Sequence, residues 1–374
     1  MYRPTIRSPF WLGLMTVSFI LLYWWAEVSR QEVKDPLYNV KIDAAQTMLK
    51  ALEALRDWRL PMLNGTQETT DEGLVYALLG DKDSPITTDE GRIEDKITAL
   101  NPNFAAVLVQ LLVEAGVRRG DTVAVAMTGS LPGANIACYA ALKALGAYPV
   151  TIVSLGSSWW GANLPDFTWL DMERVLVEEG IFSFKSVAAS LGGGDDNGGL
   201  RLSQLGSQLL VNAIRRNDVL LIQEGSLKAN IEAREKLFNR YLPLENYRAF
   251  INIGGGIATI GHRENGRLIP NGVIKTLPSR NYPAKGIIHT FAEAKVPIVH
   301  IYDPVYIAKT YHLPVSQLVL PPIGKGEIYV TQRYKMGVVI LAGVIMMGFL
   351  VMVKLFDYRY YKLKEVGVDP DTLL

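Results

Sequence analysis

Residues 122–136 read TVAVAMTGSLPGANI and contain the transition on which the fold prediction rests. Residues 122–127 are an apolar, strand-like run, and a turn rich in Gly, Ser and Pro follows it. From Leu131 to Leu145 the apolar residues then recur with helical spacing. This order of strand, turn and helix is typical of one unit of an α/β sheet.

The same alternation continues toward the C-terminus. A further helix precedes it, with Asn101 and Pro102 at its start. Because short apolar strands alternating with helices favour parallel pairing, we predict an α/β domain over residues 101–330 with a doubly wound, mostly parallel sheet. Its further strands are expected at residues 148–153, 219–223, 249–253 and 296–301, and its clearest further helices at 205–215 and 227–241.

A second strand–turn–helix unit resembles the first. Residues 219–231 read VLLIQEGSLKANI, so the triplets GSL and ANI recur with one residue's difference in spacing. Duplicated βα halves would place two equivalent loops side by side. Chance similarity between two such units is the alternative.

Both ends of the chain contain a long uncharged segment. Residues 9–26 read PFWLGLMTVSFILLYWWA and residues 336–353 read MGVVILAGVIMMGFLVMV. A helix needs roughly 17 to 25 apolar residues to cross the hydrocarbon of a membrane, so we predict one transmembrane helix at each terminus. A cleavable signal peptide is the alternative for the first segment, but that run ends in Tyr23, Trp24 and Trp25 instead of small residues.

The short tails outside these segments determine the expected orientation. Lys and Arg near membrane helices favour the cytoplasmic side, whereas long domains cross largely regardless of charge. The tails 1–8 and 354–374 both contain basic residues. We therefore predict a two-pass plasma-membrane protein with both termini cytoplasmic and the main domain extracytoplasmic, although Arg30 and Lys34 on the domain side weigh against this orientation.

Residues 27–100 are expected to form a stalk of helix and loop. Apolar residues recur at helical spacing over residues 41–58, which predicts an amphipathic helix. Residues 64–94 are polar and rich in Thr, Asp and Gly, so we expect mostly loop there, with a short apolar piece at 74–79.

Composition excludes several classes of function. The chain has 38 Lys and Arg against 37 Asp and Glu, and it lacks the clustered basic charge that nucleic acid requires. Cys138 is the only cysteine, which excludes an intramolecular disulfide and a thiolate metal site. The four histidines show no metal-ligand spacing, and residues 192–199 are interpreted as a flexible surface loop and not as a calcium site. We therefore predict no metal.

The candidate ligand site lies beyond the carboxyl ends of the strands, where open α/β sheets bind ligands. Four strand ends are rich in Gly, Ser and polar side chains, and backbone amides at such ends favour anions. The alternative is that the serines there only cap the helices that follow. The candidate binding residues are Thr128, Gly129, Ser130, Gly133, Asn135, Ser154, Gly156, Ser157, Gly225, Asn252, Gly254, Gly255 and Gly256.

The sequence gives weaker indications of catalysis. Ser130 lacks the flanking glycines of a nucleophile elbow, although a triad with a distant histidine is still compatible with the sequence. Asp171 and Glu173 precede an expected helix at residues 174–179, where helix-dipole stabilisation explains them better than acid–base chemistry. The candidate catalytic residues are Ser130, Glu224, Ser226 and Asp303.

No cofactor is predicted. Residues 254–259 begin like a dinucleotide-binding fingerprint but lack its last glycine. The chain also contains no Gly-x-x-x-x-Gly-Lys-Ser/Thr phosphate loop.

Three segments resemble the bacterial poly-gamma-glutamate system protein family. They are NPNFAAVLV at residues 101–109, GSLPG at 129–133 and GANLPDFTWLDME at 161–173. The resemblance implies a membrane component associated with the synthesis or export of a γ-linked polyglutamate capsule or released polymer. Because the chain has no phosphate loop, the ATP-dependent activation of glutamate would belong to another subunit.

The functional hypothesis is therefore an accessory subunit of such a system. Its partners would be the lipid bilayer, other subunits of the complex and the anionic polymer, which a local basic cluster such as Lys275, Arg280 and Lys285 would bind. The alternative is an extracytoplasmic hydrolase or transferase that acts on the polymer or on an envelope precursor. A module that senses a small anionic ligand is a third hypothesis.

Overall fold

The computed structural model describes residues 9–62, 71–199 and 202–367. The predicted tail 1–8 and the last residues of the predicted tail 354–374 lie outside the described residues, as does part of the predicted loop 64–94. The chain divides into two compact units. One combines residues 1–35 with 330–374, and the other is residues 36–329.

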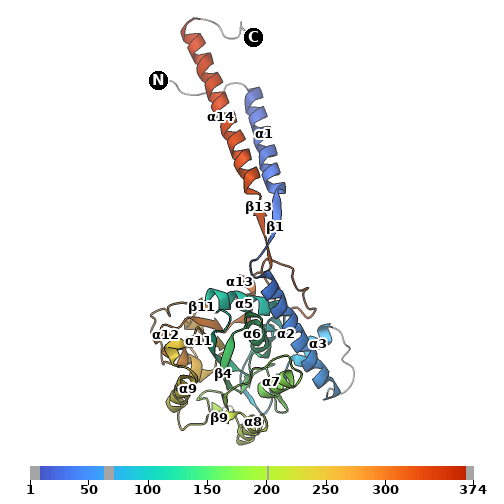
Figure 1. Ribbon diagram of the computed structural model, residues 1–374, viewed down its shortest axis with the longest axis vertical. Coiled ribbons are helices and arrows are strands. Elements are labelled where there is room, and N and C mark those ends of the chain that lie inside the picture. The colour runs from blue at the N-terminus through green and yellow to red at the C-terminus, as the bar shows by residue number, and fades with distance from the viewer. Residues whose placement is uncertain (1–8, 63–70, 200–201, 368–374) are drawn as a thin grey trace. The chain divides into compact units, whose positions relative to one another are not determined.

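The unit 36–329 is built on a seven-stranded sheet (Figure 1). Every neighbouring pair is parallel except β11 with β12. This arrangement confirms the predicted α/β domain with a mostly parallel sheet. In sheet order the strands are β11 (Gly272–Ile274), β12 (Ile298–Ile301), β10 (Phe250–Ile253), β3 (Thr122–Thr128), β4 (Tyr148–Ser154), β8 (Ala188–Ser190) and β9 (Leu220–Leu221).

Helices cover both faces of this sheet. On one side α2 (Tyr38–Arg59), α5 (Asn103–Glu114) and α6 (Pro132–Leu145) pack against one another. A second group contains α9 (Leu227–Tyr241), α10 (Ile257–Ile260) and α12 (Ile287–Glu293). The remaining helices are α3 (Asp71–Leu78), α4 (Ile93–Ala99), α7 (Trp169–Glu178), α8 (Gln204–Arg216), α11 (Asn265–Leu268) and α13 (Pro304–Thr310).

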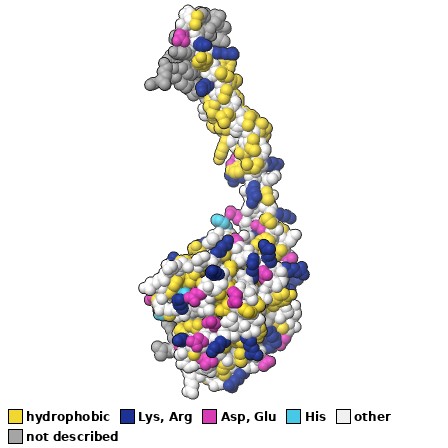
Figure 2. All heavy atoms as spheres, turned by 60° about the vertical axis from the view of Figure 1, so that its left-hand side comes forward, with side chains coloured by type: hydrophobic (Ala, Val, Ile, Leu, Met, Phe, Trp, Pro, Cys, Tyr) yellow, Lys and Arg dark blue, Asp and Glu magenta, His cyan; other side chains and the backbone are white. Residues whose placement is uncertain are grey.

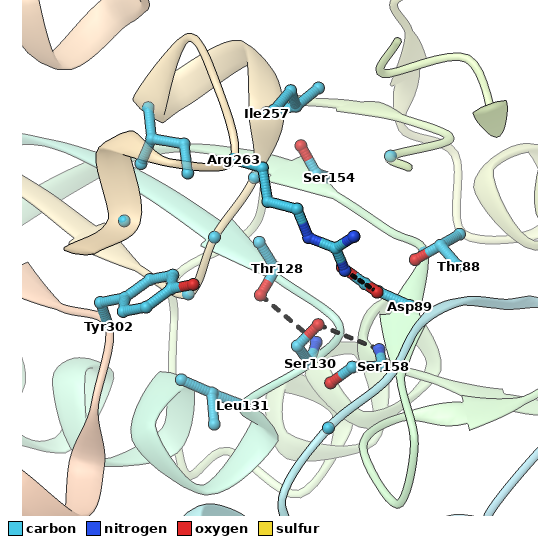
Figure 3. A pocket seen from close by; sticks show the side chains of 18 of the residues that line it. Thr88, Asp89, Thr128, Ser130, Leu131, Ser154, Ser158, Ile257, Arg263 and Tyr302 are labelled. Carbon is cyan, nitrogen blue, oxygen red and sulfur yellow. Dashed lines mark hydrogen bonds and ion pairs between the residues drawn. The ribbon is translucent and has the colours of Figure 1, made fainter. Parts of the chain in front are cut away.

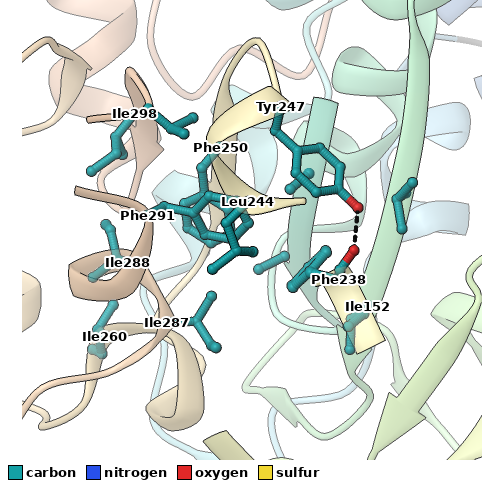
Figure 4. Packing of buried hydrophobic residues seen from close by; sticks show 14 of the residues in the cluster. Ile152, Phe238, Leu244, Tyr247, Phe250, Ile260, Ile287, Ile288, Phe291 and Ile298 are labelled. Atoms are coloured by element: carbon teal, nitrogen blue, oxygen red, sulfur yellow. Dashed lines mark hydrogen bonds between the residues drawn. The ribbon is translucent and has the colours of Figure 1, made fainter. Parts of the chain in front are cut away.

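An aromatic cluster fills the core between the sheet and α9 and α12 (Figure 4). Phe291 stacks on Phe250 with ring centroids 4.4 Å apart and meets Phe238 edge-on at 5.4 Å. Alternate residues of β3, Ala124 and Ala126, belong to this cluster. Because side chains alternate along a strand, the intervening residues of β3 face the other helical layer.

Three local features differ from the sequence-based expectations. Helix α7 begins at Trp169 and not near residue 174, because Thr168 and Asp171 form a capping box at its start. The region expected to be mostly loop contains α3, β2 (Thr87–Asp89) and the first residues of α4. Helix α2, expected as part of a stalk, packs against α5 and α6 within the compact unit.

The sheet order does not give the two similar βα units equivalent places. Strand β3 is central and pairs with β4, the next long strand of the chain. Strand β9 forms the edge of the sheet, and β10, which follows it in sequence, pairs with β3 on the other side. The loops after β3 and β9 are therefore not the adjacent pair that a duplication predicts.

The other unit joins the two ends of the chain. Strand β1 (Arg30–Lys34) pairs antiparallel with β13 (Val330–Tyr334), and α1 (Pro9–Val28) packs against α14 (Met336–Glu365). Within the described ranges one helical segment is long and apolar enough to cross a membrane, Met336–Phe356 of α14, whereas the apolar segment Gly13–Val28 of α1 is shorter than a span. Figure 2 shows hydrophobic side chains exposed along this unit.

Candidate functional site

A cleft of about 1580 Å³ opens at the point where the direction of chain winding in the sheet reverses. From β3 the chain adds β4, β8 and β9 on one side, and it then returns to add β10 and β12 on the other. Loops that leave two adjacent strands in opposite directions leave a crevice between them. The cleft therefore lies beyond the carboxyl ends of β3 and β10, as the sequence predicts for a ligand site (Figure 3).

About half of the predicted binding residues line this cleft. The loop after β10 approaches the end of β3 closely, since a Cβ on Gly254, whose φ is +91°, would lie 2.2 Å from Thr128 Oγ1. Glycine is required there by both backbone conformation and space. The predicted residues that line the cleft are Thr128, Ser130, Ser154, Gly156, Gly254, Gly255 and Gly256.

Three of the other predicted binding residues hydrogen-bond to the backbone of these loops. Asn135 Nδ2 donates to Thr128 O at 2.9 Å, Ser157 Oγ donates to Gly129 O at 3.0 Å, and Asn252 Nδ2 donates to Gly254 O at 2.9 Å. The predicted binding residues outside the cleft lining are Gly129, Gly133, Asn135, Ser157, Gly225 and Asn252.

Of the four candidate catalytic residues, two line the cleft and two do not. Ser130 and Asp303 line the cleft, whereas Glu224 and Ser226 do not. Ser226 caps α9 by accepting a hydrogen bond from the Ala229 amide at 3.2 Å. This is the helix-capping role that the sequence offered as the alternative to ligand binding. The next residue, Leu227 at the start of α9, does line the cleft.

One wall of the cleft is the glycine-rich segment 192–199, which is ordered by a buried ion pair. Asp196 is 0% exposed, and its Oδ2 lies 2.8 Å from Nη1 of Arg234 on α9. Ser154 Oγ and Ser190 Oγ donate to the other carboxylate oxygen at 3.0 and 2.8 Å. Burial raises the pKa of Asp196, and the Arg234 charge counteracts that rise. This segment is therefore anchored to the strand ends.

Lys96 lines the cleft and was not among the predicted site residues. It comes from α4 and is only 5% exposed. Its Nζ donates to Ser130 O at 2.6 Å and to Ser158 Oγ at 2.7 Å. In the described part of the chain no carboxylate lies within ion-pair distance of this ammonium group. Burial lowers the pKa of Lys96 to about 8.

The rim of the cleft carries charges of both signs. Arg92 pairs with Asp95 and Asp303 at 2.8 and 3.0 Å, and Arg263 pairs with Asp89. Arg267 is exposed, and no ion pair joins its guanidinium to a carboxylate of the described residues. Figure 2 shows the same mixture of basic and acidic side chains over the visible face of this unit.

The basic cluster proposed from the sequence is not part of the cleft lining. Lys275, Arg280 and Lys285 are all exposed. Arg280 Nη1 donates to Leu268 O at 2.8 Å, and Lys285 Nζ lies 2.6 Å from a Glu293 carboxylate oxygen. The cations that do line the cleft are Arg92, Lys96, Arg263 and Arg267.

Asp171 and Glu173, the carboxylates noted in the sequence, are held by hydrogen bonds within the fold. Burial raises the pKa of Asp171, but hydrogen bonds from Arg216, Asn217 and Thr168 outweigh it and lower the pKa overall. Burial raises the pKa of Glu173, which accepts from Tyr139 and Ser186. Among the described residues no group of three or more His, Cys, Asp or Glu is placed to hold a metal ion.

Sequence reasoning missed the cleft residues that come from outside the strand ends. Lys96 lies on a short helix next to a region expected as loop, and no local pattern marks it as functional. Arg263 and Arg267 follow the glycine-rich turn after β10, and that proximity was the available signal. Ser158 lies in the polar strand end 154–158, but it was not among the predicted binding residues.

The geometry defines the chain as an α/β protein with a polar cleft at the switch point of a parallel sheet. Comparisons of the chain with protein-family models, with curated proteins and with solved structures gave no match.

Proposed function

We propose that this chain is a membrane-anchored accessory component of poly-γ-glutamate synthesis or export, and that its cleft binds a short segment of the anionic polymer. The observation that carries the proposal is the cleft itself, in which the exposed guanidinium of Arg267 has no carboxylate partner among the described residues. Guanidinium groups bind carboxylates through paired, charge-assisted hydrogen bonds. The resemblance of three sequence segments to the polyglutamate family supplies the identity of the polymer.

The charges of the cleft favour local recognition over long-range attraction. Its four cations, Arg92, Lys96, Arg263 and Arg267, face carboxylates in similar number, so no strong positive field is expected. Binding would instead depend on individually placed groups, including the hydroxyl groups of Thr128 and Ser130. We expect modest affinity and a weak dependence on salt concentration.

Binding can be tested with the full-length chain in detergent and short poly-γ-glutamate oligomers, measured by calorimetry. We expect Arg267→Ala to weaken binding roughly 10- to 100-fold, because a charge-assisted hydrogen bond contributes about 1.5–3 kcal/mol. Arg280→Ala is the matched control, since Arg280 is an exposed arginine outside the cleft lining. Absence of binding, or equal losses in both variants, would overturn the proposal.

For the membrane we propose a two-pass arrangement in the plasma membrane, with both termini cytoplasmic and the unit 36–329 extracytoplasmic. It is supported by the apolar segment Met336–Phe356 and by the packing of α1 against α14. Other subunits of the synthesis or export complex would contact these helices. Co-purification from detergent tests that association.

Orientation can be tested with a membrane-impermeant maleimide on intact cells. The native Cys138 is fully buried, so its background labelling should be low. We expect Lys275→Cys to be labelled from outside and Arg359→Cys to be labelled only after the membrane is permeabilised. The reverse pattern would exclude the proposed orientation.

A second candidate function is a hydrolase or transferase acting at the same cleft. The contact between buried Lys96 and the Ser158 hydroxyl favours this alternative.

A further inference from the structure

We propose that the cleft contains an acyl-transfer centre in which Ser158 is the nucleophile, Lys96 is its general base and the Ser130 hydroxyl stabilises the developing oxyanion. The substrate class is an amide bond in a carboxylate-bearing chain. Only this choice of substrate rests on the proposed function; the assignment of the three roles stands on the geometry of the cleft.

Hydrogen bonds bring the three groups together at one point of the cleft lining. Lys96 Nζ is 2.7 Å from Ser158 Oγ, within the reach of a base that removes the proton of a nucleophile. The Ser158 amide donates to Ser130 Oγ at 3.0 Å, as Figure 3 shows. In the described part of the chain the Ser130 hydroxyl hydrogen has no assigned acceptor, so it is available to a carbonyl oxygen in the cleft.

A purely structural role explains Lys96 poorly. A buried ammonium group is normally paired with a carboxylate, because its removal from water is costly. Lys96 instead contacts one carbonyl oxygen and one hydroxyl group, both belonging to residues that line the cleft. Serine–lysine pairs are a known variant of the nucleophile–base arrangement.

Burial of Lys96 also favours the protonation state that a base requires. Its pKa of about 8 leaves part of the population neutral near neutral pH. Asp95 of α4 raises this pKa, and Arg92, the residue that precedes α4, lowers it. Asp303, just before α13, interacts with the same two groups. The nearby charges thus oppose one another, and burial is the largest cause of the shift.

Space above the nucleophile is maintained by a glycine. A Cβ on Gly91 would lie 2.8 Å from Ser158 Oγ, closer than such contacts allow. Gly91 lines the cleft, so its missing side chain leaves the hydroxyl group reachable from the solvent side. Ser158 itself is 7% exposed and lines the same cleft.

The reaction follows from these positions. Ser158 Oγ attacks the carbonyl carbon of the amide while its proton moves to neutral Lys96 Nζ, and the oxyanion accepts a hydrogen bond from Ser130. The C–N bond then breaks, and the leaving amine takes the proton from Lys96. Water attacks the resulting ester and gives a proton to Lys96, which returns it to Ser158 as the ester C–O bond breaks. The net change is amide plus water to carboxylic acid plus amine.

The centre can be tested with a fluorophosphonate probe, which transfers its phosphonyl group to an activated serine with loss of fluoride. Full-length protein in detergent is incubated with the probe, and the labelled peptide is identified by mass spectrometry. We expect labelling on Ser158 and a rate reduced roughly 100-fold or more both in Lys96→Met and in Ser130→Ala. Ser226→Ala is the control serine and should label like wild type.

Two further measurements separate catalysis from folding. The wild-type labelling rate should rise with pH through about 8, whereas Lys96→Arg, which keeps the charge but provides no base, should show no such rise. Cooperative melting of each variant reports whether it is folded. Absence of label on Ser158, or wild-type rates in a folded Lys96→Met or Lys96→Arg variant, would overturn the proposal.

The probe carries no glutamate, so this inference and the proposed function fail independently. Labelling of Ser158 without any binding of polyglutamate would refute the polymer as ligand and retain the acyl-transfer centre. Polymer binding without labelling would refute the centre. We also expect wild-type protein to shorten poly-γ-glutamate and Ser158→Ala not to do so; unchanged length with a labelled wild type would overturn the substrate class.

Discussion

Replacing Asp196 tests the buried ion pair that shapes the glycine-rich wall of the cleft. Asp196 is fully buried and Arg234 is 2% exposed, and their charged atoms lie 2.8 Å apart. Removing one partner of such a pair typically destabilises a protein by about 3–5 kcal/mol, because the other charge stays buried without compensation. Asp196→Asn keeps an acceptor for the Ser154 and Ser190 hydroxyl groups, so we expect about 3 kcal/mol.

The assay is urea unfolding of the full-length chain in detergent, followed by tryptophan fluorescence. The neighbouring Asp195→Asn is the matched control. Asp195 is exposed, and its Oδ1 accepts hydrogen bonds from the Asn197 and Gly199 amides, so we expect a loss of about 1 kcal/mol or less. The double variant Asp196→Asn with Arg234→Met should lose much less than the sum of the two single variants.

Two results would refute this reasoning. The first is an Asp196→Asn loss no greater than that of Asp195→Asn. The second is additivity in the double variant, which would mean that the Asp196 and Arg234 charges do not interact energetically. Because the segment 192–199 lines the cleft, destabilised variants should also bind the oligomer more weakly than the Asp195 control.

Three further predictions concern stability. The pKa of Lys96 falls from 10.5 to about 8 on folding, so the unfolded chain binds more protons between these values and the free energy of unfolding should rise with pH there. Between pH 8 and pH 10.5, measured by urea unfolding, the free energy of unfolding of the wild type should rise by about 3 kcal/mol more than that of Lys96→Met. The same free-energy difference between the two proteins at both pH values would contradict the pKa shift. Phe291→Ala should lower the free energy of unfolding by about 3–5 kcal/mol, because this fully buried ring contacts two other phenylalanine rings; a loss below 1 kcal/mol would exclude a close-packed cluster. Gly133→Ala should lower the melting temperature, by the equivalent of about 1–3 kcal/mol, because the new Cβ would lie 2.5 Å from Ala99 O, whereas Gly225→Ala, with open space around it, should change it little.

The fold class followed from local patterns in the sequence, although two three-residue strands of the sheet, β8 and β11, were not predicted. Strands β3 and β4 are seven residues long and were located within one residue, because a long apolar run has few alternative explanations. Strands β8 and β11 have three residues each, and neither is long enough to show a period. Their place in the sheet depends on pairing with neighbours.

The cleft lies at the strand ends that the sequence predicted, but only some of the predicted residues line it. The carboxyl ends of parallel strands converge at one edge, so the loops after β3 and β10 were predictable. The loop containing Glu224 and Ser226 looked equivalent in sequence, but it follows an edge strand, and neither of these two residues lines the cleft. Sequence similarity between the two βα units carried no information about strand order.

By itself the sequence determined the alternation of strands and helices, the apolar segments at the two ends and the glycine- and serine-rich turns, because each depends on residues near one another in the chain. Only the tertiary structure decided that Lys96 meets Ser130 and Ser158, which lie 34 and 62 residues away, and that Arg234 pairs with Asp196. Such contacts are set by how the layers pack, and a single sequence carries no local signal for them. The chemistry of the cleft is therefore a property of packing, built on a sheet whose class the sequence already specified.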